Sequence, residues 1–207
     1  MKADLSNIKN IIFDLGNVIL NLDFDASIKA FKKLGLKDDV LSGRSVFPDS
    51  CFYEQEIGVI TPNEFEKKIV ELLDNGKVTE EQVHSAWLKM VLDIPPHRVR
   101  MLQQLGEKYN LYLFSNSNKT HIDHIDIEFR ERYGFEFSLL FKKQFYSHEI
   151  NMRKPDLGSF ETVIQLSGVK PQETLFVDDL IENITGAEKA GLKTFWLKNG
   201  MEMVAIF

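Results

Sequence analysis

The sequence predicts an α/β protein with a Rossmann-like, doubly wound sheet of five parallel strands and a small all-helical domain inserted after the first strand. Three observations predict this fold: short apolar runs recur along the chain, polar residues directly follow several of them, and amphipathic helical patterns separate the later runs. Strands of a parallel sheet are covered on both faces, so they are apolar throughout instead of alternating.

Three of the expected strands end in polar residues. Because the carboxyl ends of parallel strands meet at one edge of a sheet, where such folds bind ligands, we expect these polar side chains to lie together. The three runs and their terminal residues are Ile11–Phe13 with Asp14, Leu111–Phe114 with Ser115 and Asn116, and Leu175–Val177 with Asp178 and Asp179.

Two further apolar runs, at 139–141 and 194–197, are expected to complete the sheet. Helical patterns lie between the later strands. One helix is expected around 160–164, and another over 184–190, where apolar residues repeat every three positions until Gly191 ends the pattern. Strands that alternate with helices in this way favour parallel pairing.

The segment after the first strand has a different character, because it carries amphipathic helical patterns without a clear strand. Two capping boxes, at 61–64 and 79–82, mark helix starts here, and Pro95-Pro96 then breaks the helical pattern. The expected division of the chain is an α/β core domain over 1–20 and 93–207 and a helical domain over 21–92.

The composition excludes several classes of protein. The chain has 207 residues, 43% of them hydrophobic, and a net charge of −6, with no basic block that would bind nucleic acid. It shows no apolar leader and no membrane-spanning run, and Cys51 is its only cysteine, so no internal disulfide forms. We therefore expect a cytoplasmic protein with a small molecule as its partner, and neither nucleic acid nor membrane. The sequence leaves the oligomeric state open.

The polar residues at the strand ends are the groups needed to transfer a phosphoryl group. Asp14 is a carboxylate nucleophile, and together with Asp179 it offers the oxygen ligands that Mg²⁺ prefers. The metal offsets the repulsion between a carboxylate and a phosphate dianion. Lys154 supplies a positive charge, while Ser115 and the backbone N–H of Asn116 supply hydrogen bonds to phosphate oxygens.

Four stretches carry a family resemblance: FDLGNV, LFSNSN, MRKPD and FVDDLIENI, in this order. They resemble the four motifs of the haloacid dehalogenase superfamily, and the match covers most of the chain. The helical insertion is similar to the C1 cap of that superfamily, and DLGNVILNLDF with SNSNKTH resembles its bacterial sugar-phosphate phosphatases. The resemblance implies a Mg²⁺-dependent phosphoric monoester hydrolase that forms an aspartyl-phosphate, with a sugar phosphate such as glucose 1-phosphate as the expected substrate.

The resemblance implies a role for each matching acidic residue. Asp14 becomes the nucleophile and a metal ligand, and Gly16 binds the metal through its backbone carbonyl. Asp179 is implied as the direct metal ligand, with Asp178 orienting Lys154 or a metal-bound water, although the two aspartates can exchange these roles.

The residues implied to hold the phosphate are Ser115, Asn116 and Lys154. Asn183 is expected to tie together the loop after the fourth strand. His121 follows the second motif where the sugar-phosphate subgroup has a histidine, so we expect it to contact the substrate. Its spacing to His124 also suits a metal, but a solvated helix face is the stronger interpretation of that pair.

Gly16 departs from the usual pattern of the superfamily. Its phosphatases usually place there the aspartate that protonates the leaving oxygen and later activates water, and a glycine does neither. General acid–base catalysis contributes roughly 10²–10⁴-fold, so we expect slower or rerouted catalysis. The candidates to replace the missing acid are Asp23, Asp25, Glu54, Glu56, His121 and a metal-bound water.

Two other functions compete with the phosphatase. A 2-haloacid dehalogenase shares the nucleophile, also lacks the second aspartate and works without metal, whereas the Asp178-Asp179 pair favours a metal enzyme. A phosphate-binding protein with weak catalysis is the other alternative. Substrate choice is expected to lie in the helical domain, with residues such as Tyr53 or Glu54, and the stretch 53–58 faces either the substrate or solvent.

Overall fold

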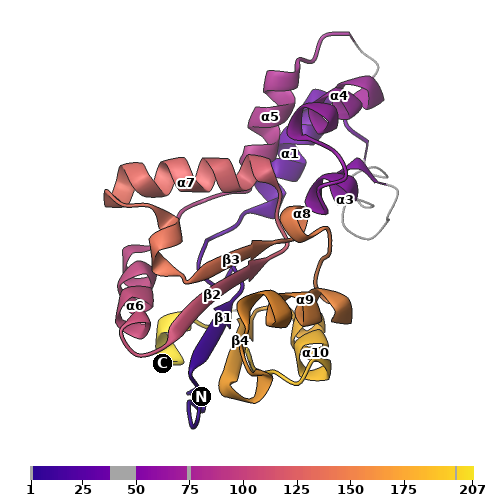
Figure 1. Ribbon diagram of the computed structural model, residues 1–207. Helices are drawn as coiled ribbons and strands as arrows, with labels where there is room; N and C mark the ends of the chain where they lie inside the picture. The colour runs from indigo at the N-terminus through magenta and orange to yellow at the C-terminus, as the bar shows by residue number, and fades with distance from the viewer. Residues whose placement is uncertain (1, 38–49, 74–75, 199) are drawn as a thin grey trace.

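The computed structural model describes residues 2–37, 50–73, 76–198 and 200–207, and it contains one sheet of five parallel strands in the order β3-β2-β1-β4-β5 (Figure 1). This sheet confirms the predicted α/β, doubly wound fold. The strands are β1 (Asn10–Phe13), β2 (Asn110–Ser115), β3 (Lys143–Tyr146), β4 (Thr174–Asp178) and β5 (Lys193–Trp196).

Helices cover both faces of the sheet (Figure 1). Ile11 and Phe13 of β1 point to one face, where they pack in a cluster with helices α6 (Pro96–Gly106) and α7 (Lys119–Tyr133). Ile12 points to the other face, against α9 (Leu157–Ser167) and α10 (Ile181–Lys189). Burial on both faces explains why the β1 sequence is apolar at every one of these three positions. The remaining short elements are α8 (Ser147–Ile150), η1 (Phe137–Leu140), η2 (Pro171–Glu173) and η3 (Met203–Ala205).

Among the described residues, four helices follow β1 before α6, and they gather beyond the carboxyl end of the sheet (Figure 1). They share an apolar cluster with four aromatic side chains, whose ring centroids lie 5.1 to 5.9 Å apart. These side chains are Phe31, Phe52, Phe65 and Trp87. The helices are α1 (Phe24–Leu34), α3 (Cys51–Glu56), α4 (Pro62–Leu73) and α5 (Glu80–Leu88). The bounds of 21–92 for a separate helical domain stay a prediction.

Local sequence explains where these helices start. The Thr79 hydroxyl accepts from the Gln82 N–H, and the Gln82 side chain accepts from the Thr79 N–H, so the predicted capping box is confirmed. Thr61 and Glu64 form the same reciprocal pair before α4. Asp23 caps α1 by accepting from the Ala26 N–H.

The prediction of a strand at 139–141 is wrong. Leu139 lies in the short helix η1 with 73% of its surface exposed, and the strand β3 begins only at Lys143. β3 is an edge strand, so its first residue stays exposed and its sequence lacks the apolar run of a central strand. Within the described part of the chain, no helix is long and apolar enough to cross a bilayer.

Candidate active site

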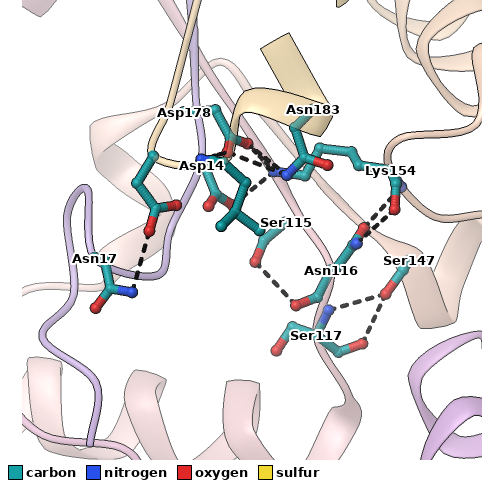
Figure 2. Close-up of polar contacts among 11 residues, drawn as sticks. Asp14, Asn17, Ser115, Asn116, Ser117, Ser147, Lys154, Asp178 and Asn183 are labelled. Atoms are coloured by element: carbon teal, nitrogen blue, oxygen red, sulfur yellow. Dashed lines mark hydrogen bonds and ion pairs between the residues drawn. The ribbon is translucent and has the colours of Figure 1, made fainter. Parts of the chain in front are cut away.

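The carboxyl ends of the strands bring the expected polar residues together. Asp14 directly follows β1, Ser115 ends β2 and Asp178 ends β4. Lys154 arrives from the loop between α8 and α9, and its side chain extends between the two aspartates (Figure 2). Four segments that are separate in the sequence thus meet at the edge of the sheet where ligands of such folds bind.

Lys154 is a buried cation held by two carboxylates. Its side chain is 1% exposed, and its Nζ lies 2.7 Å from Asp14 Oδ1 and 2.7 Å from Asp178 Oδ2. The rings of Phe114 and Phe176 each lie 5.3 Å from the same Nζ. Burial alone lowers the pKa of Lys154, but the two carboxylates outweigh burial and raise it. The lysine is therefore charged at any physiological pH.

Burial is also the largest effect on the pKa of Asp14, the acidic partner of Lys154. It raises the pKa of Asp14 to about 7, although the charge of Lys154 opposes this shift, and Asp178 adds to it. The pKa of Asp179 is raised as well, by burial and by the neighbouring Asp178. Raised pKa values mean that the ionised carboxylates repel one another and are poorly solvated, so one more positive charge would stabilise them.

The two adjacent aspartates have different surroundings. Asp178 is fully buried, and it accepts from Asn183 Nδ2 at 3.1 Å on both oxygens and from the Leu180 N–H at 2.8 Å. Asp179 is partly exposed and accepts from Asn17 Nδ2 at 3.2 Å. Asp178 is thus committed to the lysine and the loop, whereas Asp179 keeps more of its carboxylate accessible.

Three carboxylates in the described part of the chain lie close enough to hold one metal ion. One oxygen from each of Asp14, Asp178 and Asp179 lies within 4.8 Å of the others. All are hard oxygen donors, which suits Mg²⁺ and does not suit a soft metal. The donor set therefore fits the predicted magnesium.

The loop after β2 is fixed by its own side chains. Asn116 donates from Nδ2 to the Lys154 carbonyl at 2.9 Å, and its Oδ1 accepts from the Lys154 N–H at 2.9 Å (Figure 2). The side chain of Asn116 is therefore used to hold the lysine in place. The Ser115 hydroxyl makes only a long 3.5 Å contact with the Asn116 carbonyl, so it is available to a ligand.

Ser147 connects this loop to the helices beyond the sheet. Its hydroxyl accepts from the Ser117 N–H at 2.9 Å, and it lies 2.6 Å from the Glu56 carbonyl and 2.9 Å from the Ser117 carbonyl. Ser147 is fully buried. Ser147 thus bridges the end of α3 and the loop that carries Ser115.

A cavity of about 110 Å³ opens next to these groups. Its wall contains Gly16, Ser115 and Asn116 on the side of the sheet. Phe24, Phe52 and Trp87 are among the side chains that the helices contribute to the opposite wall. A small molecule in this cavity therefore lies beside the strand ends and beneath the helical segment.

A side chain at position 16 would have to displace Leu22. A Cβ built on Gly16 would lie 2.7 Å from Leu22 Cδ1, which is closer than real Cβ contacts. Both residues line the cavity. Leu22 thus fills the space that an acidic side chain at position 16 would need.

Most candidates for the missing acid are engaged elsewhere. Asp23 is a helix cap, and Glu54 forms an ion pair with Lys68 at 2.5 Å. His121 holds Asn118 Nδ2 with one ring nitrogen at 3.1 Å and the Trp87 carbonyl with the other at 3.2 Å. Asp25 lies exposed in the first turn of α1 and is absent from the cavity wall. Glu56 is the one candidate carboxylate on that wall.

His121 lines the cavity, as expected for a substrate contact, but it is not an acid. Burial lowers its pKa to about 4, and the centroid of its ring lies 4.6 Å from that of Trp87, with the planes tilted by 36°. Both nitrogens already have protein partners, so the imidazole is neutral and the metal interpretation with His124 gains no support. A substrate contact for His121 stays a prediction.

Sequence reasoning missed three of the residues that build this site. Asn17 adopts a left-handed conformation, with φ of 55°, and this turn brings its amide to Asp179. The asparagine in DLGNV was a readable signal for such a turn. Ser147 and Arg153 act through tertiary contacts with α3, and no local sequence pattern predicts these contacts.

Comparisons with known proteins agree with this geometry. A family model described as haloacid dehalogenase-like hydrolase matches residues 8–191. A D-ribitol-5-phosphate phosphatase from Bacteroides thetaiotaomicron is 32% identical over 94% of both chains. A glyceraldehyde 3-phosphate phosphatase from Pyrococcus furiosus is 24% identical over 95% of this chain and 83% of its own.

A solved structure is similar over almost the whole chain. It is a HAD family enzyme from Bacteroides thetaiotaomicron in complex with magnesium and inorganic phosphate, 34% identical, with a TM-score of 0.84 over 97% of this chain and 99% of the other. The family model, the relatives and the sheet with its strand-end cluster all lead to the same assignment. The chain belongs to the haloacid dehalogenase-like hydrolase family.

Proposed function

We propose that this protein is a Mg²⁺-dependent phosphatase that hydrolyses the phosphate ester of a small metabolite through an aspartyl-phosphate on Asp14. The observation that carries the proposal is the buried Lys154 ammonium, 2.7 Å from Asp14 Oδ1, beside a cluster of three carboxylates and a cavity for a small molecule. The phosphatases among its relatives and the magnesium and phosphate in a similar structure support it.

Asp14 is the nucleophile in this proposal. Its Oδ1 is held by Lys154, so Oδ2 attacks phosphorus, and the bond between phosphorus and the ester oxygen breaks. Water then attacks phosphorus, the bond to Asp14 breaks, and inorganic phosphate leaves. The alkoxide takes a proton from a water in the cavity, and the attacking water gives a proton to the hydroxide that this leaves, so protons balance over the two steps and the Asp14 carboxylate is regenerated.

The metal and the phosphate have separate sets of ligands. Asp14, Asp179 and the Gly16 carbonyl would hold Mg²⁺, which when bound neutralises the repulsion between the carboxylate and the phosphate. Asp178 positions Lys154. The lysine, the Ser115 hydroxyl and the Asn116 N–H would bind the remaining phosphate oxygens.

The leaving oxygen needs a proton that position 16 does not supply. Leu22 occupies the space there, the neutral His121 is engaged with protein groups, and Glu56 is paired with Arg153. We therefore expect the proton to come from water in the cavity. A positioned acid contributes roughly 10²–10⁴-fold to the rate, and we expect this enzyme to lack a part of that factor.

The substrate is a small phosphorylated metabolite, and we propose a sugar or sugar-alcohol phosphate. Glucose 1-phosphate and D-ribitol 5-phosphate are the first compounds to test. The cavity of about 110 Å³ suits a small organic group. Residues 21–92 would form a cap over the strand ends, because α1, α3 and α5 supply part of the cavity wall.

Release of inorganic phosphate from a panel of phosphate esters tests the proposal. We expect turnover with Mg²⁺ and its loss in EDTA, and Asp14→Asn should reduce kcat/KM by at least about a thousandfold. Asp123→Asn, on an exposed aspartate, is the matched control, and far-UV circular dichroism verifies that both variants fold.

Two results would contradict the proposal. Release of chloride from chloroacetate that survives EDTA would identify a dehalogenase. Saturable binding of phosphate esters without steady-state phosphate release, with Mg²⁺ present, would identify a binding protein instead.

A further inference from the structure

The cavity wall has one charged group on the side of the helical segment. Most of that side is apolar, with Phe24, Phe52, Trp87 and Met90 among its residues. Glu56, the last residue of α3, is the only carboxylate among the described residues that line this cavity. An acidic side chain in such a wall is costly unless it is held by a partner and used by a ligand.

Glu56 is held firmly by the α/β part of the chain. Its Oε1 lies 2.9 Å from Arg153 Nε, and the two side chains are 23% and 18% exposed. The Arg153 guanidinium lies 5.6 Å from the ring centroid of Tyr53, which fixes its plane. The Glu56 carbonyl lies 2.6 Å from the hydroxyl of Ser147. An ion pair of the side chain and a contact of the backbone carbonyl therefore position Glu56 at the cavity wall.

This anchoring continues through the next residues of the chain. Asn151 Nδ2 donates to the Ile57 carbonyl at 2.8 Å. Gly58 has φ of 72°, and a Cβ there would lie 2.1 Å from the His148 carbonyl oxygen. Only glycine allows the backbone to approach so closely, and this approach presses the end of α3 against α8.

We propose that Glu56, positioned by Arg153, is a specificity-determining residue that accepts hydrogen bonds from hydroxyl groups on the organic part of the substrate. The inference rests on the proposed phosphatase function and names its substrate class: a hydroxylated metabolite with one phosphate and no second anionic group.

Charge and geometry both support this role. Arg153 engages Oε1, which leaves Oε2 to accept from a ligand, and the cavity that Glu56 faces also contains Ser115 and Asn116 of the phosphate end. Burial is the largest effect on the pKa of Glu56 and raises it, and the charges of Arg153 and Lys154 offset only part of that shift. The ion pair with Arg153 is the contact that stabilises the ionised form. A carboxylate attracts hydroxyl hydrogens and repels a substrate carboxylate or second phosphate.

The test compares three phosphate esters in one preparation of enzyme with Mg²⁺: D-ribitol 5-phosphate, n-pentyl phosphate, which lacks hydroxyls, and 3-phosphoglycerate, which carries an additional carboxylate. We expect the wild type to prefer the ribitol ester over both others. In Glu56→Gln, the preference over n-pentyl phosphate should fall by about 10- to 100-fold, because a charge-assisted hydrogen bond becomes a neutral one. The loss should lie mainly in KM for the ribitol ester.

The ratio of kcat/KM for 3-phosphoglycerate to kcat/KM for n-pentyl phosphate should rise in the same variant, because the repulsion between Glu56 and the substrate carboxylate is removed. A merely structural role for Glu56 would not produce this gain. Ratios of kcat/KM within one preparation do not depend on the fraction of folded enzyme, so partial unfolding does not affect the result. Glu71→Gln is the control, since Glu71 is exposed in α4 and is absent from the cavity wall, and it should keep the wild-type ratios.

Unchanged ratios in Glu56→Gln would overturn the inference, and so would an equal loss of activity on all three esters. If the wild-type protein released no phosphate from any ester of the wider panel, the proposed function itself would fail. The two failures are therefore distinguishable.

Discussion

Leu22 Cδ1 lies 2.7 Å from the point where a Cβ on Gly16 would be built. Gly16 is absent from the glycines with positive φ in the described chain, so its backbone conformation is open to other residues and only space excludes them. Leu22 thus occupies the space where the acidic side chain of the first motif would begin. The two positions should behave as a coupled pair.

Gly16→Ala should lower the free energy of unfolding by about 1–2 kcal/mol, because the new methyl group displaces a leucine that is only partly buried. In a Leu22→Ala background the same change should cost less than half as much. Urea unfolding of the four proteins in this double-mutant cycle measures the coupling. Gly158→Ala is the control, because its Cβ would meet Met152 Sδ at an ordinary 4.0 Å. Equal costs in both backgrounds would contradict the steric explanation.

Lys154→Met should destabilise the metal-free protein by about 3–5 kcal/mol at pH 8, because it leaves two carboxylates without their buried cation. The loss should be smaller at pH 5.5. A carboxyl group whose folded pKa is raised, such as Asp14, binds its proton more readily when folded, so its ionisation penalty disappears as pH falls below that pKa.

Urea unfolding in EDTA at the two pH values measures this effect. Lys108→Met, on an exposed lysine, controls for the loss of charge and should change the stability little at either pH. A pH-independent loss in Lys154→Met would mean that the lysine contributes packing and not charge.

Mg²⁺ should stabilise the protein through the carboxylate cluster. At ten times its Kd, a ligand that binds only the folded state adds about 1.4 kcal/mol, which for a chain of this size raises Tm by about 3–6 °C. Asp179→Asn should abolish most of this shift, since Asp179 is the most accessible of the three carboxylates. Differential scanning fluorimetry with increasing MgCl₂ measures it, with Asp123→Asn as the control. A full shift in Asp179→Asn would place the ion elsewhere.

The strands that build the centre of this site were predictable from sequence, because they are buried on both faces. Ile12 faces one helical layer and Phe13 the other, so neither position tolerates a polar residue. The sequence did not predict β3, because it lies at the edge of the sheet. Lys143 is exposed there, and an edge strand does not have to be apolar at every position. The apolar run at 139–141 instead marks a short helix packed near α6 and α7.

The carboxylates and the lysine of the site were likewise predictable, because each follows a strand or belongs to a motif. Asn17, Ser147 and Arg153 were not. Asn17 contacts Asp179, and Ser147 and Arg153 contact Glu56, so each has a partner at least 90 positions away that only the fold brings close. Glu56 was one of several candidate acids. Its place on the cavity wall depends on how α3 packs against α8, and no local pattern encodes that packing.

His121 should make the protein sensitive to acid. Burial lowers its pKa from 6.5 to about 4, so the unfolded chain binds a proton at this position before the folded chain does. Stability should therefore fall as pH drops from about 6.5 to 4, by up to about 3 kcal/mol from this residue. The pKa of His148 is shifted in the same direction, because its ring is partly buried.

His121→Gln removes the titrating ring. Although it also loses the contact with Trp87, the slope of stability against pH should flatten over this range. Urea unfolding at pH 7, 6, 5 and 4.5 measures the slope. An unaltered slope in His121→Gln would show that its imidazole is not held neutral in the folded protein.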